Sequence, residues 1–307
     1  MPMSNHLKKY LFPDHETRVN AVRLSSAWQT GLAHQKLPPA VRQLLGELVA
    51  ASVLLASNLK LNGSLILQMQ GDGPIALMIV ECTSNLTIRA TASLRESVEL
   101  PSEGNLQSLI NSQEQGRFSV ILETREEGKQ ANSYQGIVPL EGNTVADALQ
   151  AYMLHSEQLE TRLWLGADDQ HSAGLLIQRL PDDQADANDD KTEGSFERAV
   201  ALASTLEQQE LLQLDTDTLI RRLFWQESLT AFHPNSVAWS CPCTRQRVRN
   251  MLLMLGEEEV NSILAEQGKV DVACNFCGKP YHFDAIDCAE LFRSGPDAKA
   301  PGSDSVH

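Results

Sequence analysis

The chain has 307 residues, 42% of them hydrophobic, which is enough for one large domain and a smaller one. Its formal net charge of -15 disfavours contact with nucleic-acid phosphates, so no nucleic-acid partner is expected. No apolar run reaches the length of a membrane span and residues 1–16 lack the apolar stretch of a signal peptide, so we expect a soluble cytoplasmic protein without a membrane partner.

Residues 1–180 combine helical and strand patterns. A helix is predicted over 40–59, directly after two prolines, because apolar or small residues recur there every three or four positions. A second helix is predicted over 144–158. Predicted strands are 19–24, 64–70, 75–82, 85–94, 118–124, 133–140, 161–165 and 174–180. Strands grouped in hairpins, with helices between the groups, indicate an α+β fold for this N-terminal core domain.

Residues 181–235 are predicted to form an acidic loop and a helical linker. The loop, 181–194, has almost nothing to bury and is expected to be flexible. Two amphipathic helices are predicted between 196 and 226, the second capped by Asp215 or Asp217. Their apolar stripe contains Phe196, Val200, Ala203, Leu206, Leu219, Ile220, Leu223 and Phe224. Such stripes usually pack in a core, and helices this short are marginal unless they dock on other structure.

Six cysteines are too few for a disulfide scaffold, and five of them fall between residues 241 and 288. Cys241 and Cys243 form one close pair, and Cys274 and Cys277 form another after thirty intervening residues. Two close pairs at this separation are typical of a four-thiolate zinc site, because each pair supplies one edge of a tetrahedron. Four thiolates close the coordination shell, so the zinc is not expected to be hydrolytic and the protein is not expected to be an enzyme.

The small C-terminal zinc-binding module is assigned to residues 236–293, and 294–307 are predicted to be a disordered polar tail. Two helices, 245–255 and 257–267, are predicted between the cysteine pairs. Gly278, directly after the last ligand, suits a tight turn that points backbone amides at sulfur.

Two cysteines and one histidine stand outside the predicted ligand set. Cys82 ends an apolar strand and Cys288 lies in the predicted last helix, so both are expected to be buried and unreactive. His282 follows Cys277 by five residues and is an alternative ligand, although four thiolates already complete the site.

Spacing alone favours a purely structural zinc ribbon. The Cys-x-Cys form of the first pair instead favours a redox-sensitive site. Two cysteines separated by one residue close only a very small disulfide ring, and such a strained bond is labile. Each pair can oxidise within itself and expel zinc. Zinc binding supplies about 10–16 kcal/mol of folding free energy to small modules, so losing it is expected to unfold this one.

Short motifs along nearly the whole chain, together with the cysteine pattern, carry a resemblance. They are Lys9-Tyr10-Leu11-Phe12, Gln70-Gly71-Asp72-Gly73-Pro74, Tyr134-Gln135-Gly136, Leu140-Glu141-Gly142, Ser156-Glu157-Gln158-Leu159, Thr161-Arg162 and Ser262-Ile263-Leu264-Ala265-Glu266. With Cys-x-Cys and Cys-x-x-Cys, they resemble the 33-kilodalton heat-shock protein family of redox-activated holdase chaperones.

The resemblance implies a stress-response mechanism. In the reduced state Cys241, Cys243, Cys274 and Cys277 bind one Zn2+ per chain, and the chaperone is inactive. Oxidants form the redox disulfides Cys241–Cys243 and Cys274–Cys277, the module unfolds, and the helical linker loses its docking partner. The protein then dimerises and holds unfolding client proteins without ATP, passing them to ATP-dependent foldase chaperones after reduction. The expected client-binding residues are Phe196, Val200, Leu206, Leu219, Ile220, Leu223 and Phe224.

Two other functions fit parts of the pattern. A zinc-ribbon nucleic-acid binder would be basic, but residues 241–290 carry five Lys or Arg and eight Asp or Glu, a local net charge of -3. A thiol–disulfide oxidoreductase would place Cys274-Asn-Phe-Cys277 at the start of a helix. Here Gly278 and Pro280 follow, and 281–283 has a strand pattern, which suits a zinc knuckle better.

Overall fold

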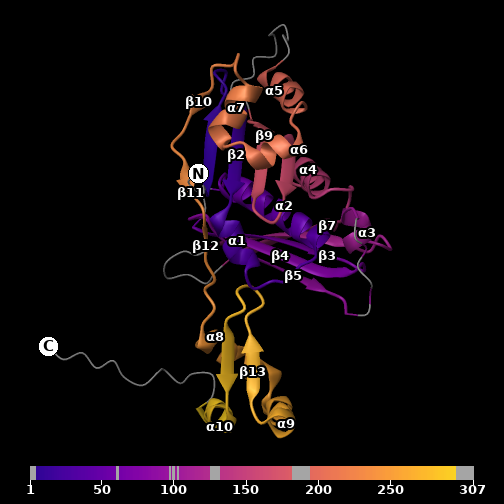
Figure 1. The fold of residues 1–307 in the computed structure, drawn as a ribbon, viewed down its shortest axis with the longest axis vertical. Helices are drawn as coiled ribbons and strands as arrows, with labels where there is room; N and C mark the ends of the chain where they lie inside the picture. Colours follow the sequence, from indigo (N-terminus) through magenta and orange to yellow (C-terminus); the bar gives the residue numbers. More distant parts are fainter. Residues whose placement is uncertain are drawn as a thin grey trace, which may run out of the picture. The chain divides into compact units, whose positions relative to one another are not determined.

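The computed structural model describes residues 5–59, 62–96, 98, 101, 104–124, 132–181 and 194–294. The chain divides into two compact units, Met1–Ser240 and Cys241–His307 (Figure 1). The predicted flexible loop and disordered tail fall at 182–193 and 295–307, which lie outside the described residues.

Two β-sheets form the framework of the first unit. Its strands are β1 (His6–Leu11), β2 (Thr17–Leu24), β3 (Gly63–Gln70), β4 (Ile75–Thr83), β5 (Thr87–Leu94), β6 (Arg117–Thr124), β7 (Asn132–Pro139), β8 (Thr161–Ala167), β9 (Ser172–Arg179), β10 (Thr230–Ala231), β11 (Asn235–Ser236) and β12 (Ala238–Trp239). Sheet A has the order β10-β1-β2-β9-β8, with β11 also paired to β1, and sheet B has the order β12-β5-β4-β3-β6-β7. The pairs are antiparallel except for β12 with β5, which confirms mixed α and β structure of the predicted kind.

A long apolar helix fills the space between the two sheets. The helices of this region are α1 (Ser26–Leu32), α2 (Pro39–Ala56), α3 (Leu106–Ile110) and α4 (Val145–His155). Helix α2 contacts strands of both sheets, and every residue from Leu44 to Ala56 is buried (Figure 1). By length and composition α2 would also suit a membrane span, but 78% of that window is buried inside the structure. Such burial is typical of a core helix.

Three short helices cover the opposite face of sheet A: α5 (Ser195–Ala203), α6 (Gln208–Gln213) and α7 (Thr216–Leu223) (Figure 1). Sheet A can pack against helices on both faces because successive side chains of a strand point to opposite sides. In β2, Val19 and Ala21 face the short helices, whereas Val22 and Leu24 belong to the core around α2. The sequence predicted two helices here, and the chain forms three. Asp215, one of the two predicted caps, accepts the Thr218 amide at 3.0 Å and starts α7.

The predicted client-binding stripe is turned inward in this structure. Phe196, Leu219, Ile220, Leu223 and Phe224 are buried, and Val200 and Leu206 pack partly buried against the same cluster. Phe12 of the N-terminal region meets the ring of Phe224 edge-on, with centroids 6.0 Å apart. The docking partner of the linker helices is therefore sheet A of their own unit. The strand pattern of the sequence did not reveal this apolar face of sheet A.

Polar contacts also fasten the linker helices to the sheet. The Tyr10 hydroxyl donates to Asp217 at 2.9 Å, and Lys8 forms an ion pair with the same carboxylate. Arg23 donates from Nε to the carbonyl of Leu212 at 3.1 Å. At the start of the linker, the guanidinium of Arg179 lies 4.6 Å from the ring centroid of Phe196. These contacts fix the direction of each helix over the apolar cluster.

Residues 230–240 form a strap that runs from sheet A to sheet B within the first unit. The strap supplies β10 and β11 to the edge of β1, and β12 to the edge of β5. Most of its side chains are exposed, whereas Val237 is buried and Trp239 half-buried. A Cβ on Gly31 of α1 would lie 2.3 Å from the Trp239 ring, so the missing side chain makes room for this anchor. The strap ends at Ser240, next to the first cysteine of the second unit.

The second unit is small and has its own core. It contains α8 (Arg245–Leu255), α9 (Glu257–Gln267), a hairpin of β13 (Val270–Ala273) and β14 (Pro280–Phe283), and α10 (Ala285–Ser294). The fully buried cluster has seven members among the described residues: Leu252, Val260, Val270, Tyr281, Phe283, Cys288 and Leu291. Few buried side chains in so short a chain favour a fold that needs an additional cross-link.

We expect Leu223→Ala to loosen the docked linker, because Leu223 is only 3% exposed between α7 and sheet A. Truncating a buried leucine costs about 2–5 kcal/mol. Native-state hydrogen exchange should show faster exchange of the α7 amides. Leu202→Ala is the matched control, because Leu202 lies on α5 with 37% exposure and its truncation should leave exchange nearly unchanged. Equal exchange in both variants would contradict the assignment of Leu223 to the docking core.

Candidate metal centre

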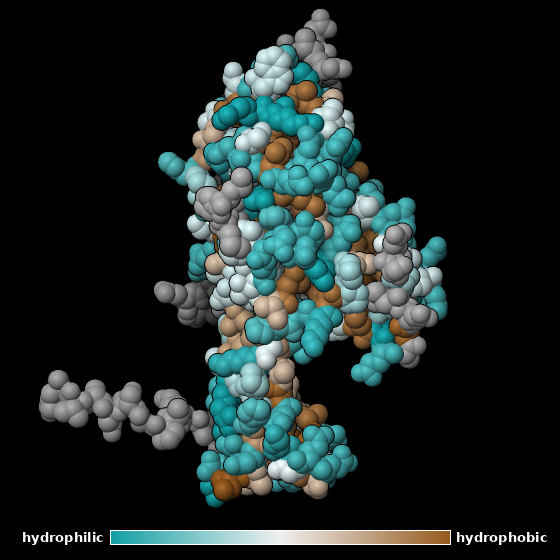
Figure 2. Space-filling model, in the orientation of Figure 1, coloured by the Kyte–Doolittle hydropathy of each residue, from teal (hydrophilic) through white to brown (hydrophobic). Residues whose placement is uncertain are grey.

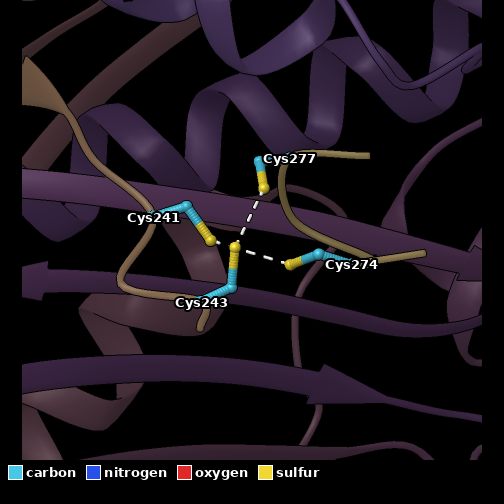
Figure 3. Close-up of side chains that lie close together, drawn as sticks. All are labelled: Cys241, Cys243, Cys274 and Cys277. Atoms are coloured by element: carbon cyan, nitrogen blue, oxygen red, sulfur yellow. Dashed lines mark hydrogen bonds between the residues drawn. The ribbon is translucent and has the colours of Figure 1, made fainter. Parts of the chain in front are cut away.

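Two loops bring the four predicted ligands together. Cys241 and Cys243 lie just before α8, whose cap residue Thr244 accepts the amide of Arg247 at 3.2 Å. Cys274 and Cys277 lie in the turn between β13 and β14. In Figure 3 the four sulfur atoms converge from these two segments on a common point.

The spacing of the sulfur atoms suits a single metal ion. All four lie within 4.8 Å of one another. Two sulfur–sulfur contacts join the segments, at 3.7 Å between Cys241 and Cys274 and 3.4 Å between Cys243 and Cys277 (Figure 3). Four sulfurs about 2.3 Å from a tetrahedral zinc would be about 3.8 Å apart along each edge. The donor set and its spacing therefore fit a four-thiolate site, and the soft ligands favour zinc among common divalent ions.

The hairpin turn is shaped for holding sulfur ligands. The Gly278 amide donates to the Cys274 carbonyl at 2.7 Å, and the Cys274 amide donates to the Lys279 carbonyl at 3.0 Å. Gly278 has φ +68°, a left-handed conformation in which a side chain would be strained. The turn lets the Lys279 amide point at the Cys277 sulfur, as the Cys243 amide does at Cys241. The predicted role of Gly278 as the residue of a tight turn agrees with this geometry.

Without a cation the cluster does not favour four thiolates. Burial tends to raise the pKa of the Cys243 thiol, but hydrogen bonds from Tyr281 and the other cysteines lower it to about 7. Burial raises the pKa of Cys241 to about 12 and also raises that of Cys277. One sulfur is thus favoured as an anion and two of its neighbours as thiols that solvate it. A bound divalent cation would supply the charge that lets all four ionise.

Tyr281 is a site residue that the sequence analysis assigned only to a strand. Its hydroxyl is buried beside the Cys243 sulfur. Interaction with the Cys243 sulfur, its largest influence, helps to raise the tyrosine pKa to about 12. A buried hydroxyl beside a thiolate ligand is a suitable outer donor, since such groups orient and stabilise metal-bound sulfur. The sequence signal, an aromatic residue four positions after Cys277, is too common to identify it.

Arg245 joins the two halves of the module from a position two residues after Cys243. Its guanidinium donates to the His282 carbonyl at 2.7 Å and pairs with Asp287 at 2.8 Å. The same group lies 4.1 Å from the ring centroid of Phe283. This Arg245 clamp therefore fixes the Cys241–Cys243 segment against β14 and α10. Pairing of this arginine within the unit also leaves the short basic series at 245, 247 and 249 less suited to nucleic acid.

The remaining candidates lie outside the cluster. Cys82 and Cys288 are 0% and 1% exposed, and burial raises the pKa of both thiols, as expected of unreactive cysteines. His282 is exposed and its Nδ1 lies 2.6 Å from Asp271, so it is not among the grouped ligands. Cys274 and Cys277 occupy a hairpin turn and not a helix start, which disfavours the oxidoreductase reading.

Comparison with known proteins gives a consistent picture. A model of the family described as Hsp33 protein matches residues 5–284. The chain is 44% identical to a 33 kDa chaperonin of Methylobacillus flagellatus, with 100% of each chain covered, and 42% identical to one of Chromobacterium violaceum, with 95% and 96% covered. The crystal structure of a 33 kDa chaperonin from Thermotoga maritima has the same fold, with a TM-score of 0.75 at 22% identity over 94% of this chain and 98% of that one.

We expect about one zinc ion per chain in the reduced protein, and Cys241→Ser should lower that content severely because three thiolates leave the shell incomplete. Metal content is measured by atomic emission on protein purified without chelator. Cys82→Ala is the control, since this buried cysteine lies in the first unit, and it should keep its zinc. Equal zinc content in both variants would exclude Cys241 as a ligand.

Arg245→Gln should weaken zinc binding about tenfold, because outer groups that position ligands typically contribute 10- to 100-fold to metal affinity. Competition with a chromogenic chelator measures the zinc dissociation constant. Arg247→Gln on the same helix is the matched control, as Arg247 is exposed. If both variants bind zinc equally well, the Arg245 clamp does not support the ligands.

Proposed function

Because the chain belongs to the Hsp33 family and gathers four cysteine sulfurs in one cluster, we propose that it is a cytoplasmic holdase chaperone regulated by oxidation. Family membership confirms the resemblance found in the sequence motifs. Relatives are named 33 kDa chaperonins, so the protein is a chaperone and not an enzyme. The observation that carries the redox proposal is the four-sulfur cluster in a unit with a very small core.

In the reduced state, Cys241, Cys243, Cys274 and Cys277 would hold one Zn2+ per chain. A bound zinc ion supplies a cross-link between the two loops and no open coordination position. The Arg245 clamp and the Tyr281 hydroxyl keep the sulfurs oriented. The module is then folded and the linker helices remain docked on sheet A, which is the inactive arrangement.

Oxidation changes the ligands themselves. Within each pair, two thiolates give two electrons to one peroxide molecule, which takes two protons from solvent and becomes two waters, and one S–S bond forms. From the family resemblance we assign the bonds to Cys241–Cys243 and Cys274–Cys277. Disulfide sulfur no longer carries the negative charge that binds zinc. The seven side chains buried in the described part of the unit are too few to hold the fold without that cross-link, so the module unfolds.

Residues 230–240 connect the linker helices to Cys241, so unfolding of the module would also affect this strap. The strap at 230–240 ends at the first cysteine, and its anchoring depends mainly on Val237 and Trp239. We propose that its release frees α5, α6 and α7 from sheet A. Both the linker stripe and the sheet face beneath it are then available to unfolding client proteins.

Later steps follow from the resemblance to the family. The oxidised protein would dimerise, hold its clients without ATP, and deliver them to ATP-dependent foldase chaperones once the disulfides are reduced. The net charge of -15 supports this role, because an acidic surface keeps a protein soluble while apolar surface is exposed.

The test is light scattering from a heat-denaturing client, with reduced zinc-loaded protein and oxidised zinc-free protein compared side by side. Only the oxidised form should suppress aggregation. The control is the Cys82→Ala variant treated with the same peroxide, which should respond as wild type does because Cys82 lies outside the cluster. Suppression by neither wild-type form would leave a structural zinc site, and equal suppression by both would remove the redox switch.

A further inference from the structure

Among the described residues, strand β7 forms an open edge of sheet B. It pairs with β6 along eight residues in continuous register, from Asn132 opposite Thr124 to Pro139 opposite Arg117. It is the last strand in the order of its sheet, and no other described strand pairs with it. The strand contains the Tyr134-Gln135-Gly136 motif, for which the redox mechanism provides no role.

The register shows which backbone groups of β7 are free to bind another chain. The Leu140 amide donates to the Gly116 carbonyl at 3.0 Å, which continues the β6–β7 ladder by one pair. Residues two, four and six positions before Leu140 therefore point their backbone groups toward β6. The alternate residues Ser133, Gln135 and Ile137 point their N–H and C=O groups away from the sheet.

The side chains of β7 are as open as its backbone. Tyr134 is 58% exposed and Ile137 is 53% exposed, and Ser133 and Gln135 are exposed as well. The strand carries no charged residue, although the chain as a whole has a net charge of -15. Natural edge strands usually carry charges, internal prolines or bulges that prevent pairing with other chains. In β7 the single proline is the last residue, Pro139, so the edge before it has none of these protections.

In the first unit, strands β1, β5 and β8 have partners on their outer edges among the described residues. The strap places β10 and β11 on β1, and β12 on β5. At the outer edge of β8, the Gln150 side chain of α4 accepts the Leu163 amide at 2.9 Å. The fold thus protects three edges and leaves β7 open, which favours a binding role for this edge over an accident of the fold.

We propose that the outer edge of β7 binds an extended segment of an unfolding polypeptide as an added antiparallel strand. This inference rests on the proposed chaperone function and names the chemistry of one client contact. Three outward N–H groups and three outward C=O groups recognise backbone, which every client has, so binding requires no particular sequence. The neutral edge selects segments of low charge. Tyr134 and Ile137 are three positions apart and so lie on opposite faces of the sheet, where each can contact an apolar side chain of the added strand.

The edge is accessible while the cysteine cluster is assembled, unlike the linker stripe. A short added strand alone binds weakly, because ordering an unfolded segment offsets much of the gain. When oxidation also exposes the linker stripe, a client held at both places binds far more tightly than at either one. The β7 edge therefore contributes to holding by the oxidised form without making the reduced form an effective holdase.

Gln135→Pro tests the edge directly. Proline lacks the outward N–H at this position, and β6 does not use that amide, so the sheet should remain intact. The oxidised variant should need about three to ten times more protein for half-suppression of aggregation of urea-unfolded citrate synthase, the effect of losing about one hydrogen bond. Gln135→Thr keeps the amide and should behave as wild type. Ile137→Lys keeps every amide, adds a charge, and should also lose activity.

Hydrogen exchange provides the second measurement. With urea-unfolded citrate synthase present, the amides of Ser133, Gln135 and Ile137 should gain protection, while the Leu140 amide should be protected with or without client. If oxidised wild type suppresses aggregation and Gln135→Pro and Ile137→Lys do so equally well, the proposal is overturned. Protection that needs no client and grows with protein concentration would assign the edge to a second copy of the chain and also overturn it. Failure of oxidised wild type to suppress aggregation counts against the proposed function, and client-dependent protection of the three amides would still support the edge.

Discussion

The contact of four sulfur atoms within 4.8 Å is the interaction on which the second unit depends. One pair precedes α8 and the other sits in the β13–β14 turn, so the cluster joins the start of the module to its hairpin. Apart from the sulfur cluster, the described part of this unit is stabilised by a core of only seven buried residues. Four neighbouring thiols also resist simultaneous ionisation, because burial disfavours their charged forms and hydrogen bonds among them favour one thiolate beside neutral thiols. A bound cation would therefore stabilise both the four thiolates and the fold of the unit. Oxidation of the sulfur atoms would remove both of these stabilising effects together.

The two units differ in what stabilises their folds, and this difference would give the proposed switch its direction. In the first unit α2 is buried between two sheets, so that part of the fold does not depend on metal. The linker helices are intermediate in stability between the core around α2 and the cysteine module. They bury a full apolar face on sheet A, yet each is too short to persist after leaving it. A strap anchored chiefly by Val237 and Trp239 leads from α7 to the cluster. The least stable elements are thus consecutive along the chain, as expected of a region that opens locally while the core persists.

Much of the fold was predictable because its signals are local. Alternation identified β3, β4, β6 and β9 closely, and the apolar repeat identified α2. The clustering of the four cysteines was predictable for the same reason, since the two close pairs are themselves local signals. Strand β1 was missed because it begins with polar residues and gains its strand character from β2 and the strap. The same holds for Arg245 and Tyr281, whose roles depend on His282, Asp287 and the sulfurs being brought near by folding.

A chaperone must bind unfolded chains without associating with its own copies, and an uncharged strand edge on an acidic protein meets both requirements. A surface able to pair with unfolded chains is also able to pair with other copies of the same protein. Hydrophilic residues cover most of the face seen in Figure 2, with hydrophobic residues in small patches. Two copies, each with a net charge of -15, repel each other over roughly the Debye length, about 10 Å at 0.1 M salt. A client segment of low charge meets little of that repulsion, and backbone hydrogen bonds act only after close approach. Long-range charge thus selects against self-pairing, while short-range hydrogen bonding remains available to clients of any sequence.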